Sequence, residues 1–250
     1  LFVEYEDVLL RRAAAAKTPE QNDQLLVKVK ETIEVSRAAE LQDYFQDDCV
    51  ATVASHRGAG TLAPGTAVIY PIAFPDRLEL LLETANGLKQ VKVPVTGDKL
   101  TKEIRSFRRL IQDSQSQNYL SSSQALHGWL VAPIQQDLQG AAVHTLVVVA
   151  EGPLRTIPMG ALHDGRHSLV DSLAVAVTPS LALTDMNAAQ RRKGSLLSVG
   201  LTESVEGQAA PRYAETEVQA IRTMYGGKLL MNKQFSGPTL EEEIKDQGLG

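Results

Sequence analysis

The sequence predicts an α/β protein with a mainly parallel sheet, preceded by an antiparallel β-meander and an amino-terminal helical segment. Short apolar runs alternate with helical patterns from residue 141 onward, which is typical of parallel strands joined by crossovers. An Asn-Gly pair between two strand-like segments indicates a hairpin further upstream. We therefore expect a helical lead-in (1–55), a meander with two helices (65–140) and the first part of an α/β domain (141–250).

The helical lead-in begins with a well-marked cap. Thr18 can cap a helix, Pro19 suits its first position, and Gln21 completes a capping box. The predicted helix covers about 18–48, with a phase slip near Ser36. Its apolar positions are Leu26, Val29, Ile33, Ala38, Leu41 and Phe45, and the remaining faces carry Glu31, Glu34, Glu40 and Asp43. The alanine-rich stretch before it is also expected to be helical, so the two helices could end a repeat array lying upstream.

The middle region predicts a meander followed by two helices. A glycine- and proline-bearing segment, HRGAGTLAPG at 56–65, is expected to link it to the lead-in. Strand-like segments at 67–72 and 78–84 precede Asn86-Gly87, which favours a type I′ turn, and valines then alternate with polar residues up to Val95. One helix face carries Leu100, Ile104, Phe107 and Ile111, and a second helix from Ser123 is expected to kink at Pro133.

The last region alternates strands and helices. Strands are expected at 146–149, 174–177, 196–199 and 229–231, with helices at 180–192 and 214–225. In the helix at 214–225 we expect Val218, Ile221 and Met224 to point inward and Gly226 to cap the carboxyl end. Thr239 and Glu242 form a capping box for a final helix.

Composition and charge exclude several classes of protein. A formal net charge of -5 argues against the cationic face that binds a phosphate backbone, so nucleic acid is not an expected partner. The single cysteine, Cys49, cannot close an intrachain disulfide, which favours a reducing cytoplasm. The longest apolar run is far shorter than the roughly 20 residues that span a bilayer, so no membrane segment is expected. The chain begins at Leu1 and ends at Gly250, and we expect it to be a piece of a longer protein.

The residue types that usually carry catalysis favour structural roles here. His163 and His167 flank Gly165-Arg166, which makes a solvated turn a better interpretation than a metal site, and no cofactor or metal is expected. Cys49 follows two aspartates, which disfavour its thiolate. Ser180 fits a helix N-cap better than a nucleophile. The remaining histidines, which we expect to be structural or exposed to solvent, are His56, His127 and His144.

The loop after the strand at 146–150 is the strongest candidate site. Ligands of open parallel sheets bind outside the carboxyl ends of the strands. Glu151, Gly152 and Arg155 lie at such an end, and we take them as candidates for a substrate-binding wall. Arg155 can offer a forked donor to a carboxylate or a peptide carbonyl, or it can form a structural ion pair with Glu151 or a neighbouring acid.

One stretch resembles a known family. Residues 146–186 read LVVVAEGPLRTIPMGALHDGRHSLVDSLAVAVTPSLALTDM. They combine a strand, an acid-Gly-x-Leu-Arg turn, an Ile-Pro step before a helix of small residues, a His-Asp-Gly turn and a Pro-Ser-Leu helix start. This pattern resembles the opening of a CHAT domain, a family of bacterial caspase-like peptidases found beside tetratricopeptide repeats. The likeness extends to AELQDYFQDDCVA at 39–51, YPIAFPDRLELLLET at 70–84, LLSVGLTE at 196–203 and the helix at 214–227.

The resemblance implies a caspase-type sandwich and thiol-dependent peptide hydrolysis by a histidine and a cysteine. The family's histidine ends a strand expected just after Gly250, in a His-Gly context, and its cysteine follows in a Ser-Ala-Cys context. We therefore assign no catalytic residue within this chain and expect it to be inactive alone. The expected partners are a protein or peptide substrate and a protein bound through an upstream helical repeat array.

Two alternatives remain. A pseudo-peptidase that serves as a scaffold or interaction module would share the fold but lack the reactive pair. An unrelated α/β ligand-binding domain would instead hold a small molecule near Gly152.

Overall fold

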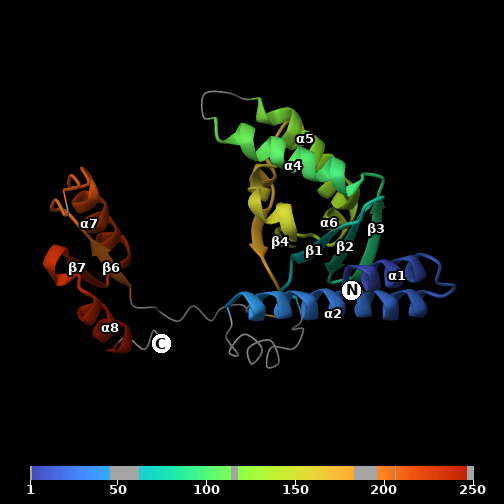
Figure 1. Cartoon of the computed structure of the whole chain (residues 1–250), viewed down its shortest axis with the longest axis horizontal. Helices are drawn as coiled ribbons and strands as arrows, with labels where there is room; N and C mark the ends of the chain where they lie inside the picture. The colour runs from blue at the N-terminus through green and yellow to red at the C-terminus, as the bar shows by residue number, and fades with distance from the viewer. Residues whose placement is uncertain (1, 46–61, 114–117, 183–195, 206, 247–250) are drawn as a thin grey trace. The chain divides into compact units, whose positions relative to one another are not determined.

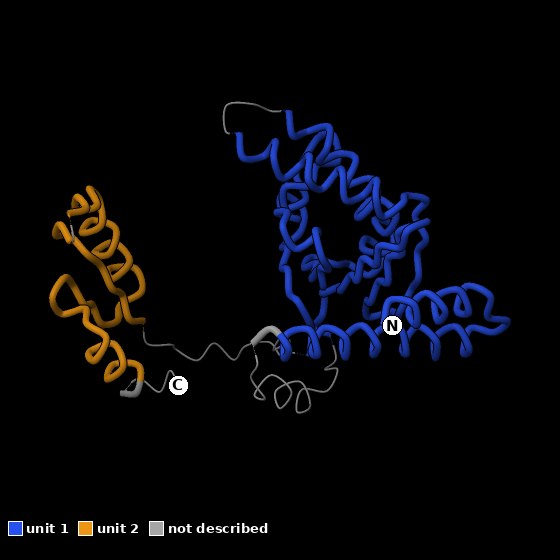
Figure 2. The backbone as a smooth tube through the Cα atoms, in the orientation of Figure 1, with its two compact units in different colours: residues 1–188 blue, residues 189–250 orange. Residues whose placement is uncertain are grey.

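The computed structural model describes residues 2–45, 62–113, 118–182, 196–205 and 207–246. Contacts divide the chain into two units, residues 1–188 and residues 189–250 (Figure 2). Each unit has its own sheet. The helical pair and the meander that the sequence predicts lie in the same unit as the first parallel strands.

A five-stranded mixed sheet forms the centre of the first unit (Figure 1). Its order is β3-β2-β1-β4-β5. The first three strands are antiparallel, while β4 runs parallel to both β1 and β5. Their bounds are β1 Thr66–Ala73, β2 Leu78–Thr84, β3 Gly87–Val93, β4 Thr145–Val149 and β5 Ala174–Thr178. The predicted mixture of meander and parallel strands is therefore confirmed, and both belong to a single sheet.

Alternate residues of the central strands contribute to two separate cores. In β4, Leu146 and Val148 pack into one core, whereas Val147 and Val149 pack into the other. Successive side chains of a strand point to opposite faces of the sheet, so a strand covered on both faces is apolar throughout. The continuous apolar run at 146–149 has this cause.

One face of the sheet is covered by α1 (Phe2–Ala14) and α2 (Pro19–Phe45), which pack against each other. The Thr18 hydroxyl accepts a hydrogen bond from the Gln21 amide at 3.3 Å, as its predicted role as a cap requires. The apolar stripes of both helices are buried against the sheet: Leu9, Leu10, Ala13, Leu26, Val29 and Ile33.

The other face is covered by α4 (Gly97–Ile111) and α5 (Tyr119–Leu130). Leu100, Ile104 and Phe107 are buried, as their spacing predicts. The helical segment from Ser123 does break at Pro133, where the turn η1 (Ala132–Ile134) separates α5 from α6 (Gln135–Gly140).

A crossover connection joins β4 to its parallel neighbour β5. It contains three short 3-10 turns, η2 (Gly152–Thr156), η3 (Met159–Ala161) and η4 (Leu169–Asp171), and the predicted helix of small residues is the turn η3. Buried apolar residues anchor this connection in the core beneath α4 and α5: Leu154, Ile157, Met159, Leu162 and Leu169.

The second unit contains two parallel strands, β6 (Leu197–Gly200) and β7 (Lys228–Met231), joined through α7 (Ala214–Tyr225). The turn η5 (Asn232–Gln234) and α8 (Gly237–Asp246) follow. Gly226 ends α7 with φ of 72°, in agreement with its predicted role. No helix in the described part of the chain is both long and apolar enough to cross a lipid bilayer.

Three local predictions are wrong. Thr84 pairs with Gly87, so the two loop residues of the hairpin are Ala85 and Asn86. A type I′ turn needs a positive φ at both loop residues, but among these positions only Gly87 has one (107°), so the turn is not type I′. Met224 is 67% exposed rather than buried. The last helix is capped by Ser236, whose hydroxyl accepts from the Thr239 amide, one turn before the predicted cap.

The predicted link at 56–65 lies mostly outside the described residues, as does most of the helix expected at 180–192.

Candidate functional site

The buried stripe of α2 changes from apolar to charged along the helix. Leu26, Val29 and Ile33 are followed, three or four residues on, by Arg37 and Glu40. Side chains at this spacing share one helix face. The carboxyl half of α2 therefore presents charged groups to the chain that leaves β4.

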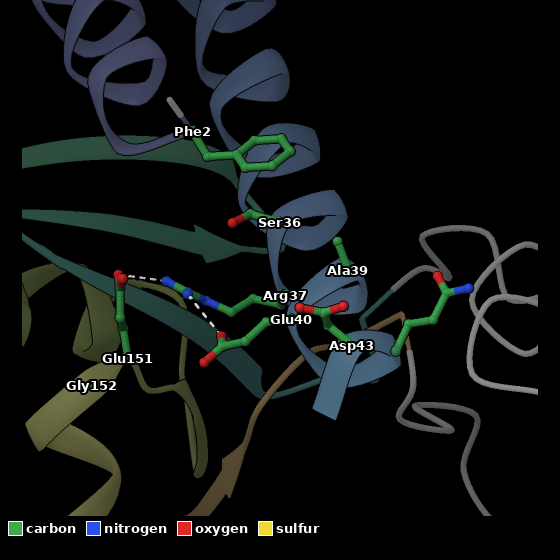
Figure 3. Close-up of a pocket in the computed structure, with 9 residues that line it drawn as sticks. Phe2, Ser36, Arg37, Ala39, Glu40, Asp43, Glu151 and Gly152 are labelled. Atoms are coloured by element: carbon green, nitrogen blue, oxygen red, sulfur yellow. Dashed lines mark hydrogen bonds and ion pairs between the residues drawn. The ribbon is translucent and has the colours of Figure 1, made fainter. Parts of the chain in front are cut away.

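Arg37 is the centre of this charged group. Its guanidinium contacts the Glu151 carboxylate at 2.5 Å and Glu40 at 3.4 Å, and Figure 3 shows it lying between the two. Only 7% of Arg37 is exposed, so its charge requires these partners. Glu151 comes two residues after the last residue of β4, and the ion pair thus fastens α2 to the carboxyl end of this strand.

Arg155 forms the structural ion pair that was one of its two predicted roles, and its partner is Glu40. Two guanidinium nitrogens donate to the two Glu40 carboxylate oxygens at 3.1 and 2.9 Å, while Nε donates to the Ala150 carbonyl at 3.0 Å. The hydrogen bonds from Arg155 lower the pKa of Glu40, although its burial acts in the opposite direction. The fork of Arg155 is thus occupied within the protein.

Glu6 of α1 carries a carboxyl group beside these ion pairs. The residue is 1% exposed, and its Oε2 atom has no hydrogen-bond partner in the described part of the chain. Burial, and to a lesser extent the nearby Glu151 carboxylate, raise the pKa of Glu6 to about 7, while Arg37 opposes the shift. Glu6 therefore changes its charge near neutral pH.

Glu34 connects α2 to the end of β5. Its carboxylate accepts hydrogen bonds from the Ser180 hydroxyl at 2.6 Å and from the amides of Leu181 and Ala182 at 3.2 and 3.1 Å. Ser180 is fully buried, and its hydroxyl donates its hydrogen bond to Glu34. The helix that Ser180 was expected to cap lies mainly outside the described residues.

A cleft of about 850 Å³ opens at the carboxyl end of β4 (Figure 3). The amino end of α1, the carboxyl half of α2 and the loop after β4 provide its walls. Its lining residues are Phe2, Ser36, Arg37, Ala39, Glu40, Gln42, Asp43, Glu151 and Gly152. Two of the three predicted candidates, Glu151 and Gly152, lie in this lining, whereas Arg155 supports it through Glu40. Their role as a substrate-binding wall stays a prediction.

The contribution of α2 to this site was not predicted from the sequence. Glu34 and Glu40 were expected on the remaining faces of the helix, which is wrong, because both face the chain that follows the parallel strands. The spacing of Arg37 and Glu40 from Ile33 could have indicated this position. No pattern in the sequence marks Glu6, because its burial depends on how α1 packs.

None of the histidines that the structure describes lines this cleft. His163 and Ser168 form an isolated bridge, and Asp164 accepts from the amides of Arg166 and His167, which confirms the predicted turn. His127 lies inside α5. Burial lowers the pKa of His127. Cys49 and His56 lie outside the described residues.

No group of acidic, histidine or cysteine side chains in the described ranges could hold a metal ion. The lining of the cleft offers the charge and the hydrogen bonding of its carboxylates and of the Arg37 guanidinium. Such groups bind and orient polar or charged ligands.

Comparison with known proteins agrees with the resemblance in the sequence. The search of curated proteins found no match. The CHAT domain family, which is caspase-like and associated with peptidases, matches residues 120–250, slightly more than half of the chain. The match begins in α5 and includes the loop after β4, the crossover to β5 and the whole second unit. The chain therefore belongs to the CHAT domain family.

Proposed function

We propose that this chain forms the amino-terminal part of a caspase-like cysteine peptidase that acts on proteins or peptides, and that these 250 residues alone do not hydrolyse peptides. The match to the CHAT domain family over residues 120–250 carries this proposal. The charged cleft at the carboxyl end of β4 adds support, because substrates of open parallel sheets bind at this edge.

The reactive pair would come from outside these residues. A cysteine peptidase needs a thiolate, an imidazole that activates it and donors for the developing oxyanion. Among the described histidines, His144 hydrogen-bonds to Thr145, and His163 accepts from the Gly165 amide. Both interactions are local and suit structural roles. In this proposal the chain supplies one side of the fold and, through Glu151, Gly152 and Arg155, part of the substrate-binding wall.

A hydrolysis assay on the purified chain tests the second half of the proposal. The chain is incubated under reducing conditions with a library of fluorogenic peptides and with an alkylating probe for reactive cysteines. We expect no thiol-dependent turnover, both for the chain and for the Cys49→Ala variant. Turnover that needs a reductant and disappears in Cys49→Ala would contradict the proposal.

The same assay on the full-length protein that contains this chain tests the first half. Thiol-dependent turnover there, lost when a downstream cysteine in a Ser-Ala-Cys context is replaced by alanine, is the expected result. A downstream sequence without the His-Gly and Ser-Ala-Cys motifs, together with no turnover, would instead identify a pseudo-peptidase that acts as a scaffold.

A further inference from the structure

β3 ends the five-stranded sheet, and its outer edge has no neighbouring strand in the described part of the chain (Figure 1). Thr84 and Gly87 pair across the two-residue hairpin loop, where the closing pair exchanges both of its hydrogen bonds. Bonded and non-bonded pairs alternate along antiparallel strands, so the backbone N–H and C=O groups of Leu88, Gln90 and Lys92 point away from β2. Among the residues that the structure describes, none forms a hydrogen bond with these backbone groups. This edge is therefore open to a further strand.

A hollow lies on each side of this edge. The α1 hollow, of about 600 Å³, is bounded by Leu10, Ala13 and Ala14 of α1 and by Leu88, Gln90 and Lys92 of β3. The α6 hollow, of about 370 Å³, is bounded by Gln136, Asp137 and Gly140 of α6 and by Gly87 and Lys89 of β3. Leu88 packs against the core beneath α1 and α2, whereas Lys89 pairs with Asp137 at 2.6 Å on the opposite face.

The two hollows suit the side chains of an added strand. Residues that lie opposite each other in neighbouring strands have their side chains on the same face of the sheet. Side chains opposite Leu88, Gln90 and Lys92 would therefore enter the α1 hollow, and those between them would enter the α6 hollow. Peptides that bind a sheet edge combine backbone hydrogen bonds with alternate pockets of this kind.

The α1 hollow carries excess positive charge. Its charged lining consists of four cationic side chains and one acidic side chain: Arg11, Arg77, Lys89, Lys92 and Glu79. Arg77 is 2% exposed, and its guanidinium already pairs with Glu79 at 2.6 Å and with Asp7 at 2.5 Å. Lys92 is exposed and has no ion-pair partner among the described residues. An acidic side chain in this hollow would lie beside Lys92.

The same lysine argues against a second copy of this chain as the added strand. Lysines on edge strands oppose the joining of sheets between like molecules. Two β3 strands side by side would bring Lys92 of both copies to one junction, where like charges repel. An acidic strand meets no such repulsion.

We propose that β3 binds an extended, acidic segment of a partner protein, which adds to the sheet as an antiparallel strand. Its backbone pairs with Leu88, Gln90 and Lys92, and its acidic side chains enter the α1 hollow. The inference does not depend on the peptidase proposal, because it concerns binding at the far edge of the sheet from β5 and no step of hydrolysis.

Fluorescence anisotropy with labelled, terminally blocked heptapeptides tests the site on the purified chain. Threonine alternates with glutamate in one peptide and with lysine in the other. At low ionic strength we expect the glutamate peptide to bind about tenfold more tightly than the lysine peptide, and added salt to weaken it. Equal binding of the two peptides, or no binding of either, would overturn the proposal.

Methylation of the peptide backbone separates strand addition from charge attraction and leaves the protein unchanged. In an antiparallel pair, the residues opposite Leu88, Gln90 and Lys92 direct their own N–H groups toward β3. N-methylation of the glutamates should therefore weaken binding at least tenfold, whereas N-methylation of the threonines should have little effect. Any other pattern contradicts antiparallel addition at this edge.

A matched pair of variants locates the binding. Lys92→Glu reverses the charge beside the α1 hollow, and Lys102→Glu makes the same change at an exposed position of α4. We expect Lys92→Glu to raise the Kd of the glutamate peptide about fivefold and Lys102→Glu to leave it unchanged. Equal effects of the two changes would refute the assignment. A dimer of the chain that Lys92→Glu disrupts and the peptide does not would show that β3 pairs with a second copy instead, and the proposal would fail.

Discussion

Replacing Glu6 with glutamine should change how the stability of the first unit depends on pH. The carboxyl group is buried, and its pKa is raised from 4.5 to about 7. A raised carboxyl pKa means that the folded protein holds the proton more tightly than the unfolded chain does. Stability is therefore fully present below the unfolded pKa near 4.5 and is lost as the pH rises through about 7.

The size of this loss follows from the shift. A difference of one pKa unit corresponds to about 1.4 kcal/mol, so ionisation of Glu6 should lower the free energy of unfolding by about 3 kcal/mol between pH 4.5 and pH 8. Because Glu6 is only 1% exposed, solvent screening reduces this value little. Glu6→Gln should be more stable than the original protein at pH 8 by a similar amount, with little difference at pH 4.5.

Urea unfolding followed by tryptophan fluorescence measures this effect. The single tryptophan, Trp129, lies in α5 and so reports on the first unit. Glu31→Gln changes an exposed glutamate on α2 and serves as the control, whose stability should follow the original protein at every pH. If the difference between Glu6→Gln and the original protein were the same at pH 4.5 and pH 8, the reasoning about Glu6 would be wrong.

Two further substitutions test the packing of the two units. Phe107→Ala should lower the free energy of unfolding of the first unit by about 3–5 kcal/mol, because the side chain is fully buried, whereas the exposed Arg108→Ala should change it little in the same urea assay. Gly227→Ala should destabilise β6 and β7 by about 2 kcal/mol or more, since Gly227 has φ of 94° and an added Cβ would lie 2.1 Å from the Leu196 carbonyl oxygen. Faster amide hydrogen exchange in both strands checks this, and Gly237→Ala, where no atom lies within 4 Å of the added Cβ, should leave the exchange unchanged.

The sequence alone predicted the elements whose cause is local. The spacing of Leu100, Ile104 and Phe107 defines one face of α4, because a helix repeats every 3.6 residues. The apolar run of β4 indicated a strand covered on both sides. Pro133 indicated a kink, because proline lacks the amide hydrogen that a helix interior needs, and the structure has a break there. The motif around Glu151 and Gly152 likewise indicated the family.

Packing between distant segments decided the composition of the cleft. Arg37 and Glu151 are far apart in the chain, and they meet only because α2 lies across one face of the sheet and β4 ends beside it. The hairpin of Asn86 was predicted in the wrong register for a related reason, since strand pairing places Thr84 opposite Gly87. Interactions of this kind depend on distances in space that no local spacing encodes.

The strand and helix pattern was thus determined by the sequence, because helix periodicity, strand alternation and turn chemistry act between near neighbours in the chain. The family was indicated by the resemblance of residues 146–186, and two of the cleft residues by their place after a predicted strand. The joining of the meander to the parallel strands, the charged face of α2 and the shifted pKa of Glu6 were decided by the tertiary structure. Burial and electrostatic interaction vary with the distance between groups in the folded protein, and that distance is set only when the helices pack on the sheet.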